Sequence, residues 1–484
     1  MEIKDGDILE LVAKTGIDGS GCHKVRHQFV NSVLSFDENP HLDPTVYTNY
    51  LLCSMAPLFL FHHTSDSEKV LLWKNPSPNS IFYARPLSLV RAKESRDVIE
   101  KEYDFLFAQI KKAETQNLKI TGREVKLKVR NTVSMVDGKM VGILQGDTGS
   151  SKCHLCTSSV QDINNVVNIL QGFVINKDYK SCMDSWKKVE EGQIEWSSTE
   201  RKGQCHMPLV PVNNFCLLHW KLRSFDFVLN ILYRLHCVVY VWGKAGGLNE
   251  DIAQSKQEVQ NHLRKKLGIL VDVPTSGGGN TNCGPVAGRF FDPKGRKTIC
   301  ELVKKEDDRE NFRVLLKDLN VMMSVCLGAR PDIKTEKVKQ LGIDIMSHIR
   351  TAFVDGEGKP WIPVNPSLHA MCAHAWELFN LCSEGVLSDY SEQAQEHWNK
   401  HVRNLKSGSN TRARQHSVKV NLRDVMCRML QVTHPVVVAN RRHLKCSICG
   451  QLGHTSRSRA HHTAENQHQV LGEDDTLINA LYNA

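Results

Sequence analysis

Two apolar segments near the start of the chain end in the same way. Residues 8–17 (ILELVAKTGI) and 125–136 (VKLKVRNTVSMV) are rich in Val, Ile and Leu, and each is followed directly by Asp-Gly. This pattern predicts a β-strand that runs into a turn, with Asp18 or Asp137 at the mouth of the strand. Between the two strands, Asn49–His63 is predicted to be buried.

Helical patterns dominate the rest of the chain. Ala92–Gln116 is highly charged and contains neither Pro nor Gly, which favours a surface helix. Leu248–Leu267 carries apolar residues along one face and is followed by Gly268, a typical C-terminal stop. Ser388–Leu405 is predicted to form another helix, with Ser388 as its N-cap.

Composition is that of a folded protein. The 484 residues are 41% hydrophobic and 24% charged, which suits roughly two to four domains. Phe225–Trp242 is the most apolar long segment, but charged residues interrupt it, so it is predicted to be a buried helix rather than a membrane span. Sixteen cysteines without a secretory signal indicate reduced thiols, some of them on metal. A net charge of +9 fits a polyanionic partner, although many basic proteins have none.

Three carboxylates are candidates for metal-dependent phosphodiester cleavage. That chemistry needs acidic groups converging on two hard cations roughly 3.5–4 Å apart. Two Asp at the ends of neighbouring strands (Asp18, Asp137) and a Glu on a distant helix (Glu396) can supply them. On that helix Glu396, Asn399, Lys400 and Arg403 share one face, which suits a metal ligand beside a DNA backbone. The alternative is a pair of ordinary Asp-Gly turns and a surface Glu–Lys pair.

Two pairs of metal-ligand residues lie far apart. Cys153-x2-Cys156 presents two thiolates at the spacing of a zinc site, and His369-x4-His374 offers two imidazoles. More than 200 residues separate them, which fits no ordinary zinc finger. From spacing alone, their pairing stays open.

Several longer stretches make the chain similar to a known family. It resembles the Transib transposases and the related catalytic subunit of the V(D)J recombination-activating complex over essentially its whole length. The stretches that carry the resemblance are IDGSG around Asp18, WKNPSPNSIFYARP at 73–86, MVDGKMVGILQGDTGSSKCHLC at 135–156, LHWKLRSFDFVLNILYRL at 218–235, GGGNTNCGPVAGRFF at 277–291, PSLHAMCAHAWEL at 366–378 and SEQAQEHWNKHVRNL at 391–405.

The resemblance implies a DDE-type active site. Asp18, Asp137 and Glu396 match the family's ligands for two Mg²⁺ or Mn²⁺ ions. Glu94 falls where the family has a fourth acidic residue, although it is equally a solvated helix acid. His219 matches a family histidine close to the active site, with a hydrogen-bonded core histidine as the alternative.

The resemblance also pairs the two metal half-sites. Cys153, Cys156, His369 and His374 match the ligands of a zinc ion that ties an insertion domain to the catalytic core. With four protein ligands that zinc would be structural, and would hold Glu396 in register with Asp137.

Further candidate residues are less specific. In the tail, Cys446, Cys449 and His454, with His461 in place of a missing Cys, are candidates for a second zinc site, against a disordered basic tail. Arg289 is a candidate contact to DNA phosphate, as are His219, Lys400 and Arg403. The Gly-rich loop before Arg289 lacks the Gly-Lys-Ser/Thr ending of a nucleotide-phosphate site.

The expected fold is α/β: an RNase H-like mixed sheet interrupted by a large, mainly helical, zinc-binding insertion. The expected domains are residues 1–150 (first part of the core), 151–385 (insertion), 386–440 (helix of Glu396) and 441–484 (zinc-knuckle-like tail).

The expected function is that of a nuclear DNA transposase or recombinase. It would nick double-stranded DNA at terminal inverted repeats and use the freed 3′-hydroxyl to form a hairpin or attack target DNA. A homodimer is expected from the family, and the need for an accessory subunit is open. Relatives carry end-binding and dimerisation domains ahead of the first catalytic Asp, where this chain has 17 residues. The alternatives are therefore a domesticated or truncated non-catalytic DNA-binding protein and a general structure-selective nuclease.

Overall fold

The computed structural model divides the chain into two compact units. It describes residues 4–20, 49–63, 68–92, 95–138, 140–141, 152–156, 158–174, 216–237, 249–274, 281–328, 332–355, 358, 360–382, 385–407, 422–439 and 473–482. One unit, here the sheet unit, holds the described residues of Met1–Thr148 and Asp389–Arg459 together with Cys216. The other, here the helical unit, holds those of Gly149–Lys180, Leu217–Ser388 and Ala460–Ala484.

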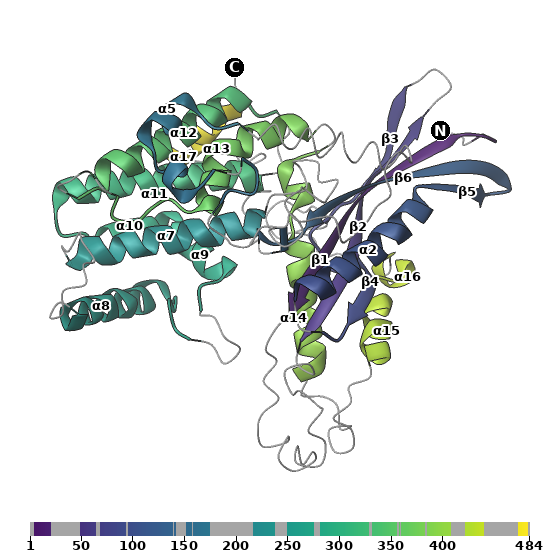
Figure 1. Cartoon of the computed structure of the whole chain (residues 1–484), viewed down its shortest axis with the longest axis horizontal. Helices are drawn as coiled ribbons and strands as arrows, with labels where there is room; N and C mark the ends of the chain where they lie inside the picture. The colour runs from purple at the N-terminus through teal and green to yellow at the C-terminus, as the bar shows by residue number, and fades with distance from the viewer. Residues whose placement is uncertain are drawn as a thin grey trace, which may run out of the picture. The chain divides into compact units, whose positions relative to one another are not determined.

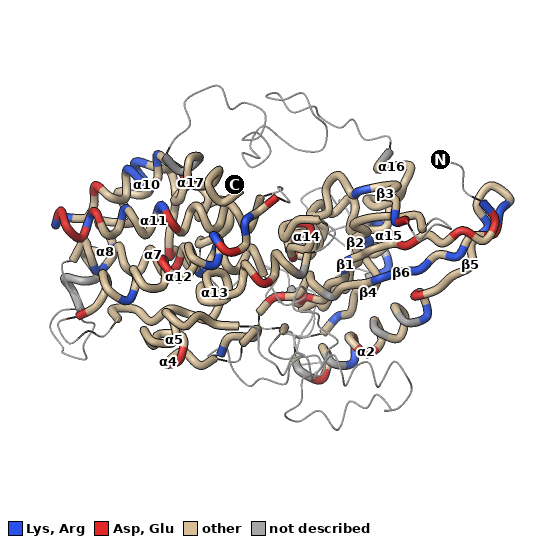
Figure 2. The backbone as a smooth tube through the Cα atoms, turned by 90° about the horizontal axis from the view of Figure 1, so that it is seen from above, with Lys and Arg blue, Asp and Glu red and all other residues tan. Residues whose placement is uncertain are grey.

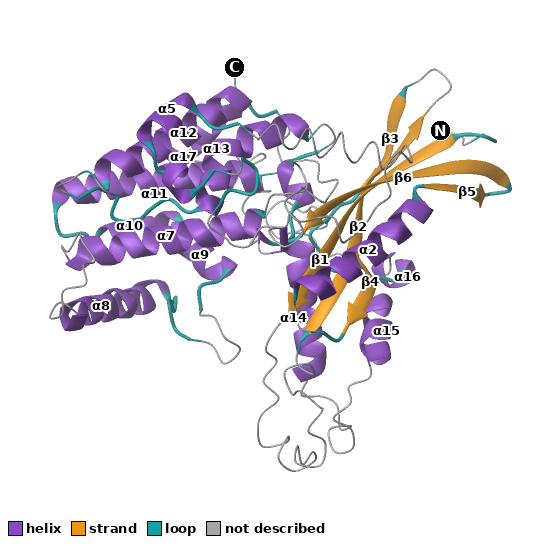
Figure 3. Ribbon diagram, in the orientation of Figure 1, coloured by secondary structure: helices purple, strands orange, loops and turns teal. Residues whose placement is uncertain are grey.

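The sheet unit is built on a mixed six-stranded sheet (Figure 3). Its strands are β1 (Ile8–Ser20), β2 (Tyr50–His63), β3 (Lys69–Lys74), β4 (Arg85–Val90), β5 (Thr115–Ile120) and β6 (Arg123–Met135). Their order is β3-β2-β1-β6-β5, with β4 also paired to β2. β1 runs parallel to β6, and every other pair is antiparallel. The chain is thus a mixed α/β protein, and both sequence-predicted strands are confirmed. The turn predicted at Asp18 is wrong, because β1 continues through Asp18 to Ser20, where it still pairs with β2.

Helices cover both faces of this sheet. α14 (Gln393–Ser407) and α15 (Leu422–Val432) share a buried apolar cluster with Leu52 and Ala56 of β2. Ser88 is paired in register with Cys53, and its hydroxyl donates a hydrogen bond at 2.9 Å to the Glu102 carboxylate of α2 (Arg96–Ala113). Successive residues of a strand point to opposite faces. Leu52 therefore belongs to the face that α14 covers, and Cys53 to the face that α2 covers (Figure 1). α16 (Pro435–Ala439) follows α15.

The predicted start of the helix that carries Glu396 is wrong. Residues Leu387–Tyr390 form a separate 3₁₀ helix, in which the Ser388 hydroxyl donates to the Gly328 carbonyl instead of capping a longer helix. α14 begins only at Gln393, whose backbone N–H donates to the Ser391 hydroxyl at 3.3 Å. Glu396 consequently lies in the first turn of α14.

The helical unit consists of helices and short connections among its described residues, with isolated bridges such as Lys152 with Ser159 and Val354 with Pro360. Its helices are α4 (Val160–Ile163), α5 (Val166–Gln171), α7 (Leu217–Cys237), α8 (Asn249–Leu267), α9 (Gly284–Phe291), α10 (Pro293–Cys300), α11 (Glu306–Leu327), α12 (Thr335–Ala352), α13 (Pro366–Leu381) and α17 (Glu473–Tyr482). α7 is buried over most of its length, as its apolar pattern predicts. In the part of the chain that the structure describes, no helix has the length and apolarity needed to cross a membrane.

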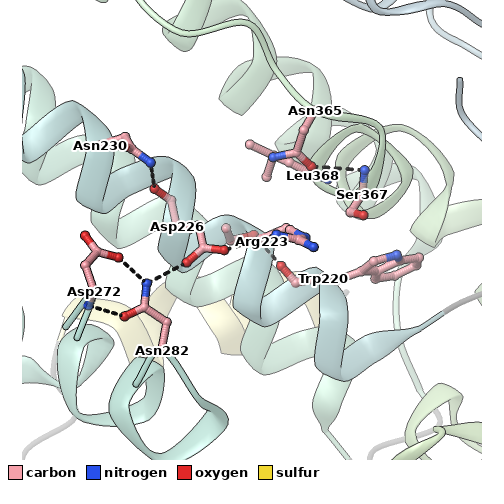
Figure 4. Close-up of polar contacts among 10 residues, drawn as sticks. Trp220, Arg223, Asp226, Asn230, Asp272, Asn282, Asn365, Ser367 and Leu368 are labelled. Atoms are coloured by element: carbon pink, nitrogen blue, oxygen red, sulfur yellow. Dashed lines mark hydrogen bonds and ion pairs between the residues drawn. The ribbon is translucent and has the colours of Figure 1, made fainter. Parts of the chain in front are cut away.

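Hydrogen bonds of Asn282 connect the segment after α8 to α7. The side-chain amide of Asn282 donates to Asp226 of α7 at 3.0 Å and to Asp272 at 2.8 Å (Figure 4). The Asn282 oxygen accepts from the Asp272 backbone N–H at 2.9 Å. Burial raises the pKa of Asp226, and Asn282 opposes that rise. The charge that interrupts the apolar α7 sequence is therefore satisfied internally.

Candidate functional site

Asp18 and Asp137 lie at the same end of the two parallel strands, Asp18 inside β1 and Asp137 just past the end of β6. In the parallel pair of β1 and β6, Gly16 is level with Met135, so the two aspartates each lie two residues further on. Gly16 permits this close approach, because a Cβ there would lie 2.3 Å from the Met135 carbonyl oxygen. Asp18 is buried and Asp137 is half-buried. The two carboxylates are therefore adjacent by topology, as the strand pattern predicts.

Asp137 also has a local structural partner. One of its carboxylate oxygens accepts from the Met140 backbone N–H at 2.6 Å, and its carbonyl accepts from Val141 at 2.9 Å. Asp137 thereby caps the helical turn that begins at Gly138. This contact fixes the direction of the Asp137 side chain.

α14 is held in one rotational setting against the sheet. Gln395 accepts from the Ser54 hydroxyl at 2.5 Å and donates to the Leu52 carbonyl at 2.8 Å. The Trp398 indole donates to the Ala84 carbonyl at 2.6 Å. These buried contacts leave α14 little freedom to rotate or slide.

That setting turns the Glu396 side of α14 toward Asp18. Asn399 is buried, and its side-chain amide donates to the Asp18 carboxylate at 2.5 Å. Residues three apart on a helix share a face, so half-buried Glu396 lies on the side of α14 that meets Asp18. The shared face of Glu396 and Asn399 was expected from the sequence, whereas the partner of Asn399 was not.

The buried thiol of Cys216 interacts electrostatically with the acids of this site. Cys216 donates to the Val136 carbonyl at 2.8 Å, directly before Asp137. Its pKa is raised first by burial and then by the negative charges of four carboxylates: Glu392, Asp137, Asp18 and Glu396. All four acids thus lie within electrostatic reach of one group in the sheet unit. Clustered carboxylates repel one another, and a divalent cation relieves that repulsion.

Glu392 is an acid that the sequence analysis missed. It is buried beside the first turn of α14, and its carboxylate accepts from the Ser391 hydroxyl at 3.2 Å. Its carbonyl accepts from the backbone N–H groups of Gln395 and Glu396. It stands four residues before Glu396 in the sequence, which is the only available signal for it.

Lys14 is a second missed residue. It is fully buried on β1, and its ammonium donates to the Asn79 side chain at 2.8 Å and to the Ser391 carbonyl at 2.7 Å. Burial lowers the pKa of Lys14 to about 7, although the charges of Asp389 and Glu392 act in the opposite direction. Lys14 ties β1 to the residues that start α14 and so helps to place Glu396.

A second candidate site lies within the helical unit. Cys153, Cys156, His369 and His374 bring one ligand atom each within 4.8 Å of all the others, a set that could hold a metal ion. Tetrahedral ligands of zinc lie roughly 3.3–3.8 Å apart, given Zn–S and Zn–N bonds of about 2.3 and 2.0 Å. All four residues are buried. The structure therefore brings together two half-sites that the spacing alone did not pair.

The chemistry of these four groups fits a metal. The Cys153 thiol, followed by His369, stabilises the thiolate of Cys156 and lowers its pKa. His369 Nε2 lies 3.3 Å from the Cys156 sulfur. His374 Nδ1 contacts Glu377 at 2.8 Å, while its buried Nε2 has no hydrogen-bond partner among the described residues. A carboxylate behind a histidine commonly orients that histidine toward a metal.

Two asparagines place the histidines beside the cysteines. Asn365 caps α13, accepting from the backbone N–H groups of Ser367 and Leu368 (Figure 4). Asn164, at the end of α4, accepts from the Val364 N–H at 2.8 Å and donates to its carbonyl at 3.2 Å. The segment that follows the cysteines is thereby fixed to the start of α13.

The remaining predicted residues lie on several helices or outside the described residues. His219 is half-buried on α7, and Lys400 is exposed on α14. Arg289 is exposed, but its guanidinium donates to the Gly268 carbonyl at 3.1 Å and so caps the end of α8. Arg403 lies in α14, and its side chain is outside the described part of the structure. Outside the described residues altogether are Glu94, Cys446, Cys449, His454 and His461.

Neither the protein-family models nor the curated proteins with which the chain was compared match it.

Proposed function

We propose that the protein is a DDE-type DNA transposase or recombinase. The observation that carries the proposal is geometric: Asp18 and Asp137 each lie two residues beyond the level pair Gly16–Met135, and the helix of Glu396 bonds to Asp18 through Asn399. The sheet supports an RNase H-like assignment, because its two central parallel strands deliver the aspartates to one edge. The helix that bears Glu396 packs on the same face as Asp18.

The proposed reaction has two phosphodiester steps. Water attacks a phosphorus atom at the boundary of the element, and the bond to the 3′ oxygen breaks to leave a 3′-hydroxyl. That hydroxyl then attacks a second phosphodiester, which gives a hairpin or joins the element to target DNA. Bound Mg²⁺ or Mn²⁺ at Asp18, Asp137 and Glu396 would supply the positive charge that favours both attack and departure.

The residues around the acids would keep this arrangement rigid. Asn399 holds Asp18, the Met140 N–H holds Asp137, and Lys14 holds the start of the helix that carries Glu396. Preorganised ligands need little rearrangement when the cations and DNA bind. Glu392 is available as a further acid at the same place.

We also propose that the Cys153–Cys156–His369–His374 group holds a structural zinc ion. The donor set of two sulfurs and two nitrogens is the usual one for zinc, and four protein ligands leave no position for a substrate. The partners proposed with this function are double-stranded DNA and a second copy of the chain, in the nucleus.

The test is a cleavage assay with the Glu396→Gln variant. With a labelled end substrate in Mg²⁺, we expect Glu396→Gln to nick and join at least about 100-fold more slowly, since a lost ligand costs several kcal/mol of charge stabilisation. Glu336→Gln, an exposed change of the same kind on α12, should behave as the unaltered protein. Equal nicking by Glu396→Gln would overturn the assignment of this site.

One observation favours a non-catalytic alternative. The Asp137 carboxylate already caps a helical turn, and Asp18 already accepts from Asn399, so both acids have structural uses. A domesticated DNA-binding protein would retain them for that reason. It would bind DNA in the assay, but neither the unaltered protein nor any variant would cut it.

A further inference from the structure

We propose that duplex DNA binds, through its phosphate backbone, to the face of the sheet that carries α14. The binding surface is the part of this face that α14 leaves uncovered, and it leads to the carboxylates. This proposal rests on the proposed function and adds to it the surface that receives the substrate. The surface, here the basic row, consists of Lys126, Lys128 and Arg130 of β6 with Lys69 and Lys74 of β3.

The register of the sheet puts the basic row on the face of the candidate site. Lys126, Lys128 and Arg130 alternate along β6, and all three are exposed. They are level with Ile8, Glu10 and Val12 of β1, which have the same parity as Lys14 and Asp18. Side chains at alternate positions share a face. Figure 2 shows the basic positions along β6.

Strand β3 adds two cations to the same face. Lys69 lies 4.1 Å from the centre of the Phe61 ring, and Lys74 lies 5.6 Å from that of Phe59. Their stems cover buried aromatic rings while the ammonium groups stay near solvent, with side chains 32% and 48% exposed. Lys74 also lies 3.5 Å from Asp389.

One buried acid organises the cations of this face. Glu10 contacts Lys69 at 2.9 Å, Arg130 at 2.8 Å and His63 at 2.9 Å. Burial alone would raise the pKa of Glu10, but these three partners lower it to about 2. Glu10 is therefore ionised at neutral pH and fixes the position of both cations. Two other acids on β1 and β6 share this parity, exposed Glu124 and the buried Asp18 of the candidate site, so the five cations of the basic row outnumber the acids beside them.

The geometry suits a duplex that runs along the strands. Alternate residues of a strand lie roughly 6.7 Å apart, and six residues separate the level of Arg130 from Asp18, which is about 20 Å. A base pair rises about 3.4 Å, so phosphates on the basic row would lie roughly six base pairs from the bond to be cut. An extended row of cations on one face matches a polyanion with regularly spaced charges.

The test compares two double variants of the full chain. Lys126→Ala/Lys128→Ala removes two charges from the basic row, and Lys101→Ala/Lys112→Ala removes two exposed charges from α2 on the opposite face. Fluorescence polarisation with a labelled 30-base-pair duplex, at several salt concentrations and without divalent cations, gives the affinity and its salt dependence. Each lost phosphate contact lowers the slope of log K against log salt by about 0.9.

We expect the slope to fall by about 1.8 and the affinity by roughly 10–60-fold at 0.1 M salt for the basic-row variant, with no change for the α2 variant. Equal losses in both variants, an unchanged slope, or equally tight binding of polyglutamate would overturn the proposal. Glu396→Gln should bind the duplex normally. Normal cleavage by Glu396→Gln together with the expected binding loss would refute the proposed catalytic site and leave the DNA surface standing.

Discussion

Lys14 connects stability to the placement of the candidate site. Its ammonium is fully buried and bonded to Asn79 and to the Ser391 carbonyl, so it lies between the central strand and the start of α14. A buried lysine is costly to keep charged, and burial accordingly lowers the pKa of Lys14 to about 7. The neutral amine can still donate both hydrogen bonds.

This lowered pKa predicts a pH dependence of folding. Between about pH 7 and 10.5 the unfolded chain holds a proton on Lys14 that the folded chain lacks. Stability therefore rises with pH across this window, by up to about 1.4 kcal/mol per pH unit from this group. Lys14→Met should remove that contribution while it retains the buried volume. Urea unfolding at pH 6.5, 8 and 9.5 measures it, and parallel pH curves for the two proteins would contradict the assignment.

Glu377 should tune the metal group of the helical unit. It contacts His374 Nδ1 at 2.8 Å and leaves Nε2 for the metal. Glu377→Gln keeps the shape but weakens the orienting hydrogen bond, so we expect a loss of about 10–100-fold in zinc affinity. Competition with a chelating indicator measures this. Glu336→Gln, an exposed change on α12, is the control, and equal affinities of both variants would exclude an orienting role.

At the scale of residues, the sequence predicted the acids better than their supports. Asp18 and Asp137 stand out because an Asp-Gly pair follows an apolar run, although at Asp18 the strand continues instead of turning. Cys153-x2-Cys156 stands out because of its spacing. Lys14 carries no such local signal: it is one charge inside an apolar strand, and its partners are 65 and 377 residues away. The places of Cys216 and Glu392 in the candidate site follow from the structure and not from the sequence.

At the scale of elements, the main correction concerns α14. Periodicity joined Ser388 to the helix, because a 3₁₀ turn and an α-helix have similar patterns over a few residues. The strands were predicted more accurately, since β1 and β6 have long apolar runs. Their parallel pairing across more than 100 residues has no local signature and required the structure.

Gly16 marks a close contact between two strands that a larger residue would disrupt. A Cβ at this position would lie 2.3 Å from the Met135 carbonyl oxygen, so Gly16→Ala must push β1 and β6 apart just before both aspartates. We expect loss of cleavage together with a destabilisation of roughly 1–3 kcal/mol. Gly138→Ala is the matched control, because a Cβ there meets nothing within 4 Å. Full activity in the Gly16 variant would contradict this close strand pairing.

At the scale of the whole molecule, each unit is assembled from separated parts of the chain. The sheet unit combines Met1–Thr148 with Asp389–Arg459, and the helical unit draws on Gly149–Lys180 as well as Leu217–Ser388. An interrupted core was expected from the family resemblance, since spacing alone does not link the first strands to the helix of Glu396. Local sequence patterns cannot predict which distant segment completes the sheet unit, because the contacts that place it join residues hundreds of positions apart.

The metal group predicts which of the two units depends on zinc. Cys153 and Cys156 lie in a short segment whose described backbone ties include one isolated bridge, Lys152 with Ser159, so the metal would supply much of its fixation. Chelation should therefore accelerate amide hydrogen exchange in α4, α5 and the first turns of α13, and zinc but not Mg²⁺ should restore protection. Exchange in β1 and β6 serves as the internal control and should not change, because the four ligands all belong to the helical unit. Protection of α4 and α13 that is indifferent to chelation would show that packing alone holds the cysteines beside the histidines.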